Sequence, residues 1–157
     1  MSTDLTGRRA LVTGGASGIG EAIARAFADA GAEVTVADLN AEGAERVAAD
    51  MGGRPWVVDL SDTAALRELS LDVDILVNNA GIQHVSPIEQ FDPERFSFML
   101  RLMLEAPFLL IRAALPGMYE RGFGRVLNVS SVHGIRASEY KSAYVTAKHG
   151  LEGLSKT

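Results

Sequence analysis

The sequence predicts an α/β domain in which helices cover both faces of a parallel sheet, the arrangement called doubly wound. Short apolar runs rich in Val, Leu and Ile alternate with helical patterns almost from the first residue. These runs have no polar face, which is typical of strands that are covered on both sides. Because strand and helix alternate, we expect right-handed crossovers between parallel strands. A chain of 157 residues suits one domain with one core.

Five runs are expected to be buried strands of this sheet. Each is short and rich in apolar residues, and a turn signal or a helical pattern separates it from the next. They are residues 10–13, 33–37, 55–58, 74–78 and 125–129.

Five helices are expected, because Ala, Leu and charged residues recur with a 3.6-residue rotation. Asn40 and either Ser61 or Asp62 are suitable N-caps, and Gly31 and Gly52 are suitable stops. The expected helices are residues 20–30, 41–51, 63–69, 93–120 and 142–157.

Composition and charge exclude several classes of function. The chain has 15 Lys and Arg against 20 Asp and Glu, so no basic surface favours nucleic acid. It has no Cys, which excludes disulfides, thiol catalysis and Cys-based metal sites, and no metal is expected. The most apolar stretch, 96–118, contains three charged residues, so no membrane span is expected. The polar amino terminus is unlike a signal peptide, and we expect a soluble, cytoplasmic protein.

A glycine-rich segment, TGGASGIG, lies between the first predicted strand and the first predicted helix. Glycine lets the chain turn tightly and lets a ligand approach where a Cβ would collide. Free N–H groups and the positive end of the helix dipole then favour a pyrophosphate. In this context the segment predicts a dinucleotide site on a Rossmann-type fold, with a plain tight turn as the alternative. The expected contacts are Thr13, Gly14, Ser17, Gly18, Ile19 and Gly20.

Acidic residues end the second and third predicted strands. Asp38 follows Gly20 at about the spacing at which an acid accepts both hydroxyls of an adenosine ribose. Its charge would repel a 2′-phosphate, so NAD is favoured over NADP, and a solvated strand-end Asp is the alternative. Asp59, followed by Leu60, is expected near the adenine amino group, and a helix-capping role for Asp59 is the alternative.

Four motifs in order resemble the short-chain dehydrogenase/reductase family. They are TGGASGIG, the NNAG at residues 78–81, Ser131, and Tyr144 followed by Lys148. The resemblance extends over essentially all 157 residues. It implies that the NNAG segment lines the cofactor, for which a plain turn is the alternative. The residues concerned are Asn79, Ala80 and Gly81.

Ser131, Tyr144 and Lys148 form the expected catalytic group. Tyr144 and Lys148 are four residues apart, so on a helix they share a face. Free Tyr has a pKa of about 10, which a nearby ammonium and a bound nicotinamide cation would lower. Tyr144 would then accept the alcohol proton as hydride leaves, and Ser131 would donate to the substrate oxygen. The resemblance adds cofactor contacts of Tyr144 and Lys148, that of Lys148 being with the nicotinamide ribose, and an exposed Tyr and Lys are the alternative.

Three further residues narrow the resemblance to the 3-hydroxybutyrate dehydrogenase branch of the family. Gln83, His133 and Lys141 lie in the stretches NAGIQHV, SSVHG and YKSAYVTAKHGLEGLSK. In that branch the corresponding residues hold the substrate carboxylate, a task that suits a cation and two hydrogen-bond donors. An exposed Lys and a loop Gln are the alternative. The expected substrate contacts are Gln83, Ser131, His133, Lys141 and Tyr144.

These residues predict reversible, NAD-dependent oxidation of (R)-3-hydroxybutyrate to acetoacetate. Two alternatives stay open. One is a short-chain dehydrogenase for another small secondary alcohol, and the other is a truncated, non-catalytic module that binds NAD or forms oligomers.

The chain departs from the family pattern in two ways. Family members carry an Asn on the long helix where this chain has Met103, which cannot support the proton relay by hydrogen bonding. They are also about a hundred residues longer, and the last helical pattern has no Gly or Pro stop. We therefore expect the domain, residues 1–157, to lack its C-terminal edge. A dimer or tetramer is expected through exposed apolar helix faces, which carry Leu109, Ala113, Ala143 and Leu151.

Overall fold

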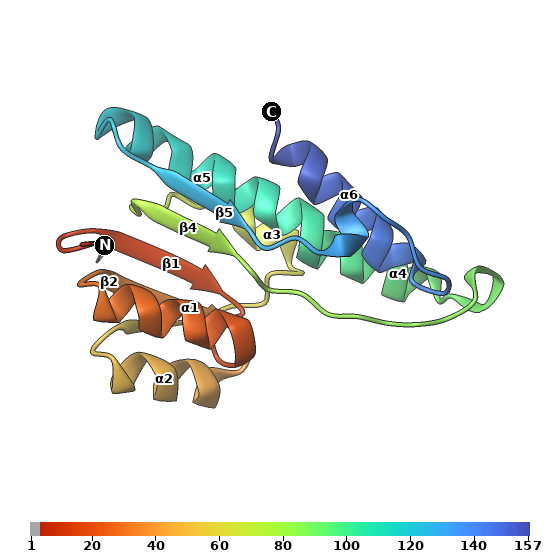
Figure 1. The fold of residues 1–157 in the computed structure, drawn as a ribbon, viewed down its shortest axis with the longest axis horizontal. Coiled ribbons are helices and arrows are strands. Elements are labelled where there is room, and N and C mark those ends of the chain that lie inside the picture. Colours follow the sequence, from red (N-terminus) through yellow and green to blue (C-terminus); the bar gives the residue numbers. More distant parts are fainter. Residues whose placement is uncertain (1–3) are drawn as a thin grey trace.

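The computed structural model describes residues 4–157 and contains one parallel sheet with the strand order β3-β2-β1-β4-β5 (Figure 1). The predicted fold class is therefore confirmed. Each strand lies within one residue of its predicted range at either end. The strands are β1 (Arg9–Thr13), β2 (Glu33–Asp38), β3 (Arg54–Val57), β4 (Ile75–Asn78) and β5 (Arg125–Asn128). The expected burial was wrong for β3 and β5, whose residues are mostly exposed because these strands lie at the two edges of the sheet.

Helices connect the strands and begin and end near the predicted signals. Asn40 accepts from the N–H of Gly43 at 3.1 Å, and Asp62, rather than Ser61, caps the next helix. Gly31 and Gly52 follow two helix ends with positive φ. The helices are α1 (Gly18–Asp29), α2 (Ala41–Asp50), α3 (Thr63–Leu66), α4 (Pro93–Leu100), α5 (Ala106–Glu120) and α6 (Ser142–Leu154), with short 3-10 turns at Ile88–Gln90 and Val132–Gly134.

The single helix predicted over 93–120 was wrong in one respect. A π-helical segment, Arg101–Glu105, separates α4 from α5. The buried residues Met99, Met103 and Ala106 keep the three- to four-residue spacing of an α-helix through this segment, so periodicity alone does not reveal it. Met103 lies in the middle of this segment and is 1% exposed.

The two faces of the sheet carry separate apolar clusters. Alternate residues of a strand point to opposite faces. Ala10 and Val12 pack with α1 and α2, whereas Leu11 packs with α3 and α5. Figure 1 shows α1 and α2 below the sheet and α5 above it, with α6 lying along α4. Within residues 4–157, none of the helices has the length and apolarity needed to span a membrane.

The helix faces expected to be exposed for association were predicted incorrectly. Leu109, Ala143 and Leu151 are all buried within the chain, at 6%, 0% and 1% exposure. Leu109 packs in the cluster between the sheet and α5, Ala143 packs in the cluster between α4 and α6, and Ala113 is half-buried. The large apolar side chains that α5 does expose are Phe108 and Tyr119.

A buried carboxylate joins the amino ends of β1 and β4 to the end of α5. Asp74 accepts from the N–H of Arg9 at 3.0 Å and from Nε of Arg121 at 2.8 Å. Arg121 also donates to Asp72 at 2.7 Å. Burial alone would raise the pKa of Asp74, but the hydrogen bonds and charges of both arginines hold it below its usual value.

Asp74→Asn is expected to destabilise the fold by about 3 kcal/mol, because it leaves the Arg121 guanidinium without its buried counter-charge. The folded pKa is lowered, so the carboxylate stabilises the fold at neutral pH and loses this effect as the pH falls through that value. Urea unfolding measures the change. Asp72→Asn, at a side chain 70% exposed, is the control and should cost less than about 1 kcal/mol. An equal cost for the two variants would contradict the prediction.

Candidate active site

The carboxyl ends of the strands open onto a cavity of about 630 Å³. Its walls come from the loops after all five strands, from α4, the π segment and α6. Strand order reverses beside β1 in this topology, which leaves a crevice where ligands bind. The predicted site residues that line the cavity are Gly14, Ser17, Gly18, Ile19, Asp38, Asp59, Leu60, Asn79, Ala80, Gly81, Gln83, Tyr144 and Lys148.

The glycine-rich loop follows β1 and leads directly into α1. Gly14 and Gly18 have φ of +64° and +55°, the left-handed region that favours glycine. A Cβ on Gly20 would collide with the carbonyl of Gly14, so only glycine lets α1 start this close to the loop. Ser17 is the N-cap, but its side chain accepts from no N–H, unlike the caps of α2, α3 and α4. The first N–H groups of α1 are therefore available to an anion at the cavity.

Thr13 and Asn79 fasten this loop to the end of β4. The hydroxyl of Thr13 donates to Val77 O at 3.1 Å. It also accepts from the N–H groups of Asn79 at 2.9 Å and Ala80 at 3.1 Å. The Asn79 amide donates to Thr13 O at 3.0 Å and Gly14 O at 3.2 Å. Thr13 is 1% exposed, so it supports the loop from behind and does not line the cavity.

Asp38 ends β2 at the cavity, and backbone N–H groups hold both of its carboxylate oxygens. Oδ2 accepts from Ala16 at 3.0 Å and Oδ1 accepts from Asn40 at 3.0 Å. A carboxylate oxygen can accept more than one hydrogen bond. Asp38 can therefore keep these contacts and still accept from hydroxyl groups in the cavity.

Asp59 also lines the cavity but makes a local turn. It accepts from the hydroxyl of Ser61 at 2.7 Å and from its N–H at 2.8 Å, and these bonds lower the pKa of Asp59. The cap of α3 is Asp62, so the helix-capping alternative for Asp59 is wrong.

Helix α6 carries Tyr144 and Lys148 on the side that faces the cavity. Ala143 and Ala147 pack against α4 and the π segment, which fixes the rotation of α6 about its axis. Lys148 is 4% exposed, and its Nζ donates to Val129 O at 2.6 Å and lies 5.7 Å from the centre of the Tyr144 ring. Burial lowers the pKa of Lys148.

Ser131 and Tyr144 are both neighbours of His133. The Ser131 hydroxyl accepts from His133 N at 3.2 Å and lies 3.3 Å from its Nδ1. The His133 ring meets the Tyr144 ring edge-on at 5.8 Å, and its Nε2 lies 2.7 Å from the hydroxyl of Ser138. Ser130 lines the cavity, whereas Ser131 and His133 lie just outside its lining.

Two loops carry the remaining residues predicted to contact substrate. Gln83 lines the cavity after β4, and Lys141 is the half-buried N-cap of α6, outside the lining. Ser86 N donates to Tyr140 O at 2.8 Å, which joins the two loops. Tyr140 has φ of +63°, a conformation that costs a non-glycine residue roughly 1 kcal/mol and that leads the chain into Lys141.

Sequence reasoning missed several lining residues. Leu39 follows Asp38 and is 67% exposed. Its apolar side chain stands next to the acid expected at the ribose, and this position could have identified it as a lining residue. Phe98 and Leu102 are four residues apart on one helical face, a spacing that by itself indicates only core packing. Met103 contacts the cavity loop, since a Cβ on Gly81 would lie 3.2 Å from its Sδ. The missed residues are Leu39, Val58, Ile82, Phe98, Leu102, Val129 and Ser130.

Comparison with known proteins agrees with this geometry. Residues 8–157 match the family model described as short chain dehydrogenase. The chain belongs to this family. It is 45% identical over 164 residues to the D-beta-hydroxybutyrate dehydrogenase of Cupriavidus necator and 40% identical over 166 residues to that of Rhizobium meliloti. The resemblance inferred from the motifs, including the branch, is confirmed.

A solved structure of the same fold supports the family assignment. It is described as a putative NAD(P)-dependent gluconate 5-dehydrogenase from Beutenbergia cavernae with bound NADP at low occupancy. The TM-score is 0.88 at 35% identity, over 98% of this chain and 66% of that chain. The alignments with the two D-beta-hydroxybutyrate dehydrogenases cover 97% and 96% of this chain and 64% of each relative. The chain thus spans just under two thirds of the length of these two relatives.

Proposed function

We propose that this short-chain dehydrogenase transfers hydride reversibly between NAD and a small 3-hydroxy acid, most specifically between (R)-3-hydroxybutyrate and acetoacetate. The observation that carries the proposal is the buried ammonium of Lys148, which lies one helical turn from Tyr144 at the cavity. Across the same cavity lie the uncapped first turn of α1 and the carboxylate of Asp38. The two D-beta-hydroxybutyrate dehydrogenase relatives support the choice of substrate.

The residues present fit a dinucleotide. The first turn of α1 offers unpaired N–H groups to the pyrophosphate. Gly18 is exposed and leaves room for it, because even a Cβ at this position would meet no other atom within 4 Å. Asp38 would accept from the adenosine ribose, and Lys148, with one protein acceptor, would donate to the nicotinamide ribose. When bound, the nicotinamide supplies the hydride acceptor.

Asp38 also favours NAD over NADP. Its carboxylate lies at the cavity beside the loop, where a 2′-phosphate would meet a like charge. Like charges placed together cost several kcal/mol, so we expect NADH to bind about 100-fold more tightly than NADPH. Equal dissociation constants for the two would contradict the choice of cofactor but leave the dehydrogenase proposal standing.

Tyr144 and Ser131 carry out the proton transfer and the hydrogen bonding to the substrate oxygen. Tyr144, one helical turn from the buried Lys148 ammonium, accepts the proton of the substrate hydroxyl during oxidation. The hydroxyl of Ser131 donates to the substrate oxygen, where negative charge develops. In the reverse direction Tyr144 returns its proton to that oxygen.

Lys141, Gln83 and His133 are proposed to hold the carboxylate of the substrate. Lys141 lies three residues before Tyr144 at the start of α6, and Gln83 lines the cavity. His133 adjoins both Ser131 and Tyr144. A charge-assisted contact to a carboxylate explains the choice of a 3-hydroxy acid over a neutral alcohol.

Lys141→Ala is expected to raise KM for 3-hydroxybutyrate about 10-fold or more, because one charge-assisted hydrogen bond is lost. The dissociation constant for NADH should stay the same. Steady-state kinetics and NADH titration measure the two quantities, and Lys156→Ala, an exposed site, is the control. An unchanged KM would contradict the carboxylate assignment.

A second candidate is a cofactor-binding module without turnover, which is favoured because the residues that line the cavity include Ser130 but not Ser131. NADH binding and oxidation of 3-hydroxybutyrate by this chain, and by the chain extended at its C-terminus to the length of its relatives, separate the candidates. If only the extended chain oxidises 3-hydroxybutyrate, the result would favour the cofactor-binding module without turnover for residues 1–157. A panel of neutral secondary alcohols tests the remaining alternative, a dehydrogenase for another small secondary alcohol.

We also propose a cytoplasmic homo-oligomer, with Phe108 and Tyr119 as the apolar side chains of α5 available to a second subunit.

A further inference from the structure

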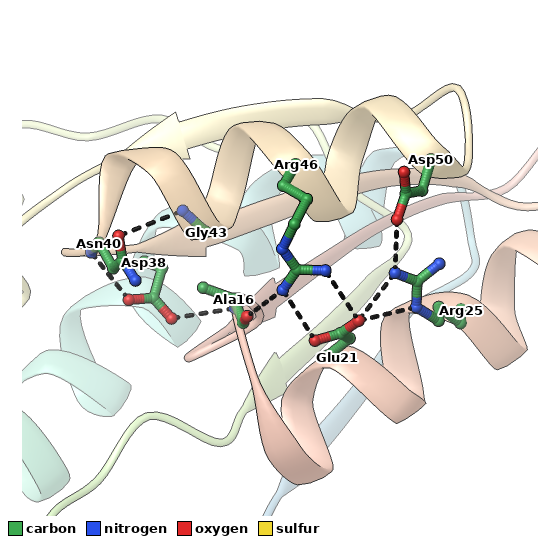
Figure 2. Close-up of polar contacts among 8 residues, drawn as sticks. All are labelled: Ala16, Glu21, Arg25, Asp38, Asn40, Gly43, Arg46 and Asp50. Atoms are coloured by element: carbon green, nitrogen blue, oxygen red, sulfur yellow. Dashed lines mark hydrogen bonds and ion pairs between the residues drawn. The ribbon is translucent and has the colours of Figure 1, made fainter.

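The peptide groups on both sides of Ala16, in the middle of the glycine-rich loop, are held by residues from β2 and α2. Ala16 N donates to Asp38 Oδ2 at 3.0 Å, and Ala16 O accepts from Arg46 Nη2 at 3.2 Å (Figure 2). Ala16 is 4% exposed. A Cβ on Gly43 would lie 2.9 Å from the Ala16 Cβ, so the first turn of α2 packs directly on the loop.

Arg46 is oriented by an ion-pair network between α1 and α2. Glu21, in the first turn of α1, accepts from Arg46 Nη2 at 3.2 Å and Nη1 at 3.4 Å. Glu21 also accepts from Arg25 Nε at 2.9 Å, and Arg25 pairs with Asp50 at 2.8 Å. Figure 2 shows a continuous chain of contacts from Ala16 through Arg46, Glu21 and Arg25 to Asp50, in which Arg46 is the side chain bonded to the loop. Hydrogen bonds from Arg46 and Arg25 lower the pKa of Glu21, which is therefore ionised at neutral pH.

The contact with Ala16 O has a consequence for the next residue. The carbonyl of Ala16 and the N–H of Ser17 belong to one planar trans peptide, in which the two groups point in opposite directions. Arg46 holds the carbonyl toward α2, so the N–H of Ser17 points away from α2. Ser17 itself lines the cavity at the start of α1.

We propose that Arg46, oriented by Glu21, is a positioning residue for the dinucleotide. It fixes the peptide between Ala16 and Ser17 so that the N–H groups at the start of α1 are directed at the pyrophosphate before the cofactor arrives. The inference rests on the proposed function, because it concerns the cofactor site of the same dehydrogenase. No mechanistic step has required Arg46 or Glu21, and neither side chain lines the cavity.

Arg25 provides a matched control within the same network. It pairs with Glu21 and Asp50 and bridges the same two helices, but none of its hydrogen bonds goes to the loop. Partly exposed ion pairs contribute little to global stability. A merely structural role would therefore make Arg46→Met and Arg25→Met equivalent, whereas a positioning role separates them.

The test measures NADH binding by energy transfer from Trp56, the single Trp, together with amide hydrogen exchange of the free protein. Arg46→Met is expected to raise the dissociation constant about 10-fold, the effect of one charge-assisted hydrogen bond. It should also accelerate exchange of the N–H groups of Gly15 and Ala16 about 10-fold, since these are bonded to Ala37 O and Asp38. Arg46→Lys should lie between Met and the wild type, and Arg25→Met should stay within about two-fold on both measures.

Equal effects of Arg46→Met and Arg25→Met on binding and exchange would overturn the inference. A wild-type chain that does not bind NADH would contradict the proposed function instead. In that case the exchange rates of Gly15 and Ala16 in the free protein still decide whether Arg46 holds the loop.

Discussion

Tyr144→Phe is expected to lower kcat for oxidation of 3-hydroxybutyrate about 1,000-fold, because a phenyl ring cannot accept the substrate proton. The ring would keep its edge-on packing against His133 and its place beside Lys148. NADH binding should therefore change less than about two-fold. Steady-state kinetics and NADH titration test the two halves of this prediction.

Tyr119→Phe is the matched control, since Tyr119 lies on α5 and is 73% exposed. It should leave kcat unchanged. If Tyr144→Phe keeps more than about a tenth of the wild-type activity, Tyr144 is not the general base.

Lys148→Met is expected to abolish turnover and, at the same time, to stabilise the fold by about 1 kcal/mol at pH 7. Lys148 is 4% exposed and its ammonium has one hydrogen bond, to Val129 O. One hydrogen bond offsets only part of the free energy needed to remove the ammonium from water. Burial lowers the folded pKa of Lys148 below the value of 10.5 for the unfolded chain. The protonated side chain therefore opposes folding below the lowered pKa, and this penalty declines as the pH rises from there toward 10.5.

Urea unfolding at pH 7 and at pH 10 measures both parts of the Lys148 prediction. The stability difference between Lys148→Met and the wild type should be larger at pH 7 than at pH 10. Lys156→Met, at an exposed site, should show no such dependence. A variant less stable than the wild type at pH 7 would contradict the view that the lysine is kept for chemistry at a cost in stability.

The inner strands of the sheet could be predicted from sequence because β1 and β4 are buried on both faces, whereas the edge strands β3 and β5, largely exposed, were found by their short apolar runs alone. Runs such as 74–78 are apolar throughout most of their length, and this signal does not depend on neighbouring elements. The glycines were equally informative, since the positive φ at Gly14 and Gly18 is a backbone requirement that few other residues meet. Local rules of this kind placed each strand to within one residue at either end.

What the sequence could not reveal depends on contacts between distant segments. Thr13 was expected at the cofactor, but its hydroxyl bonds the end of β4, which no local pattern indicates. Leu109 and Leu151 were expected to be exposed, because a helix with apolar residues on several sides does not show which side faces the sheet. Arg46 went unnoticed for the same reason, since its contact with Ala16 joins residues 30 positions apart.

The bonds between Thr13, Asn79 and the glycine-rich loop have a mechanical consequence. They join the turn after β1 to the turn after β4, so these two segments form one rigid platform. The loops at 82–88 and 135–141 share a single backbone hydrogen bond, from Ser86 to Tyr140, and carry many exposed side chains. We therefore expect these two loops to change conformation when a ligand enters the cavity, and the joined turns after β1 and β4 to stay as they are.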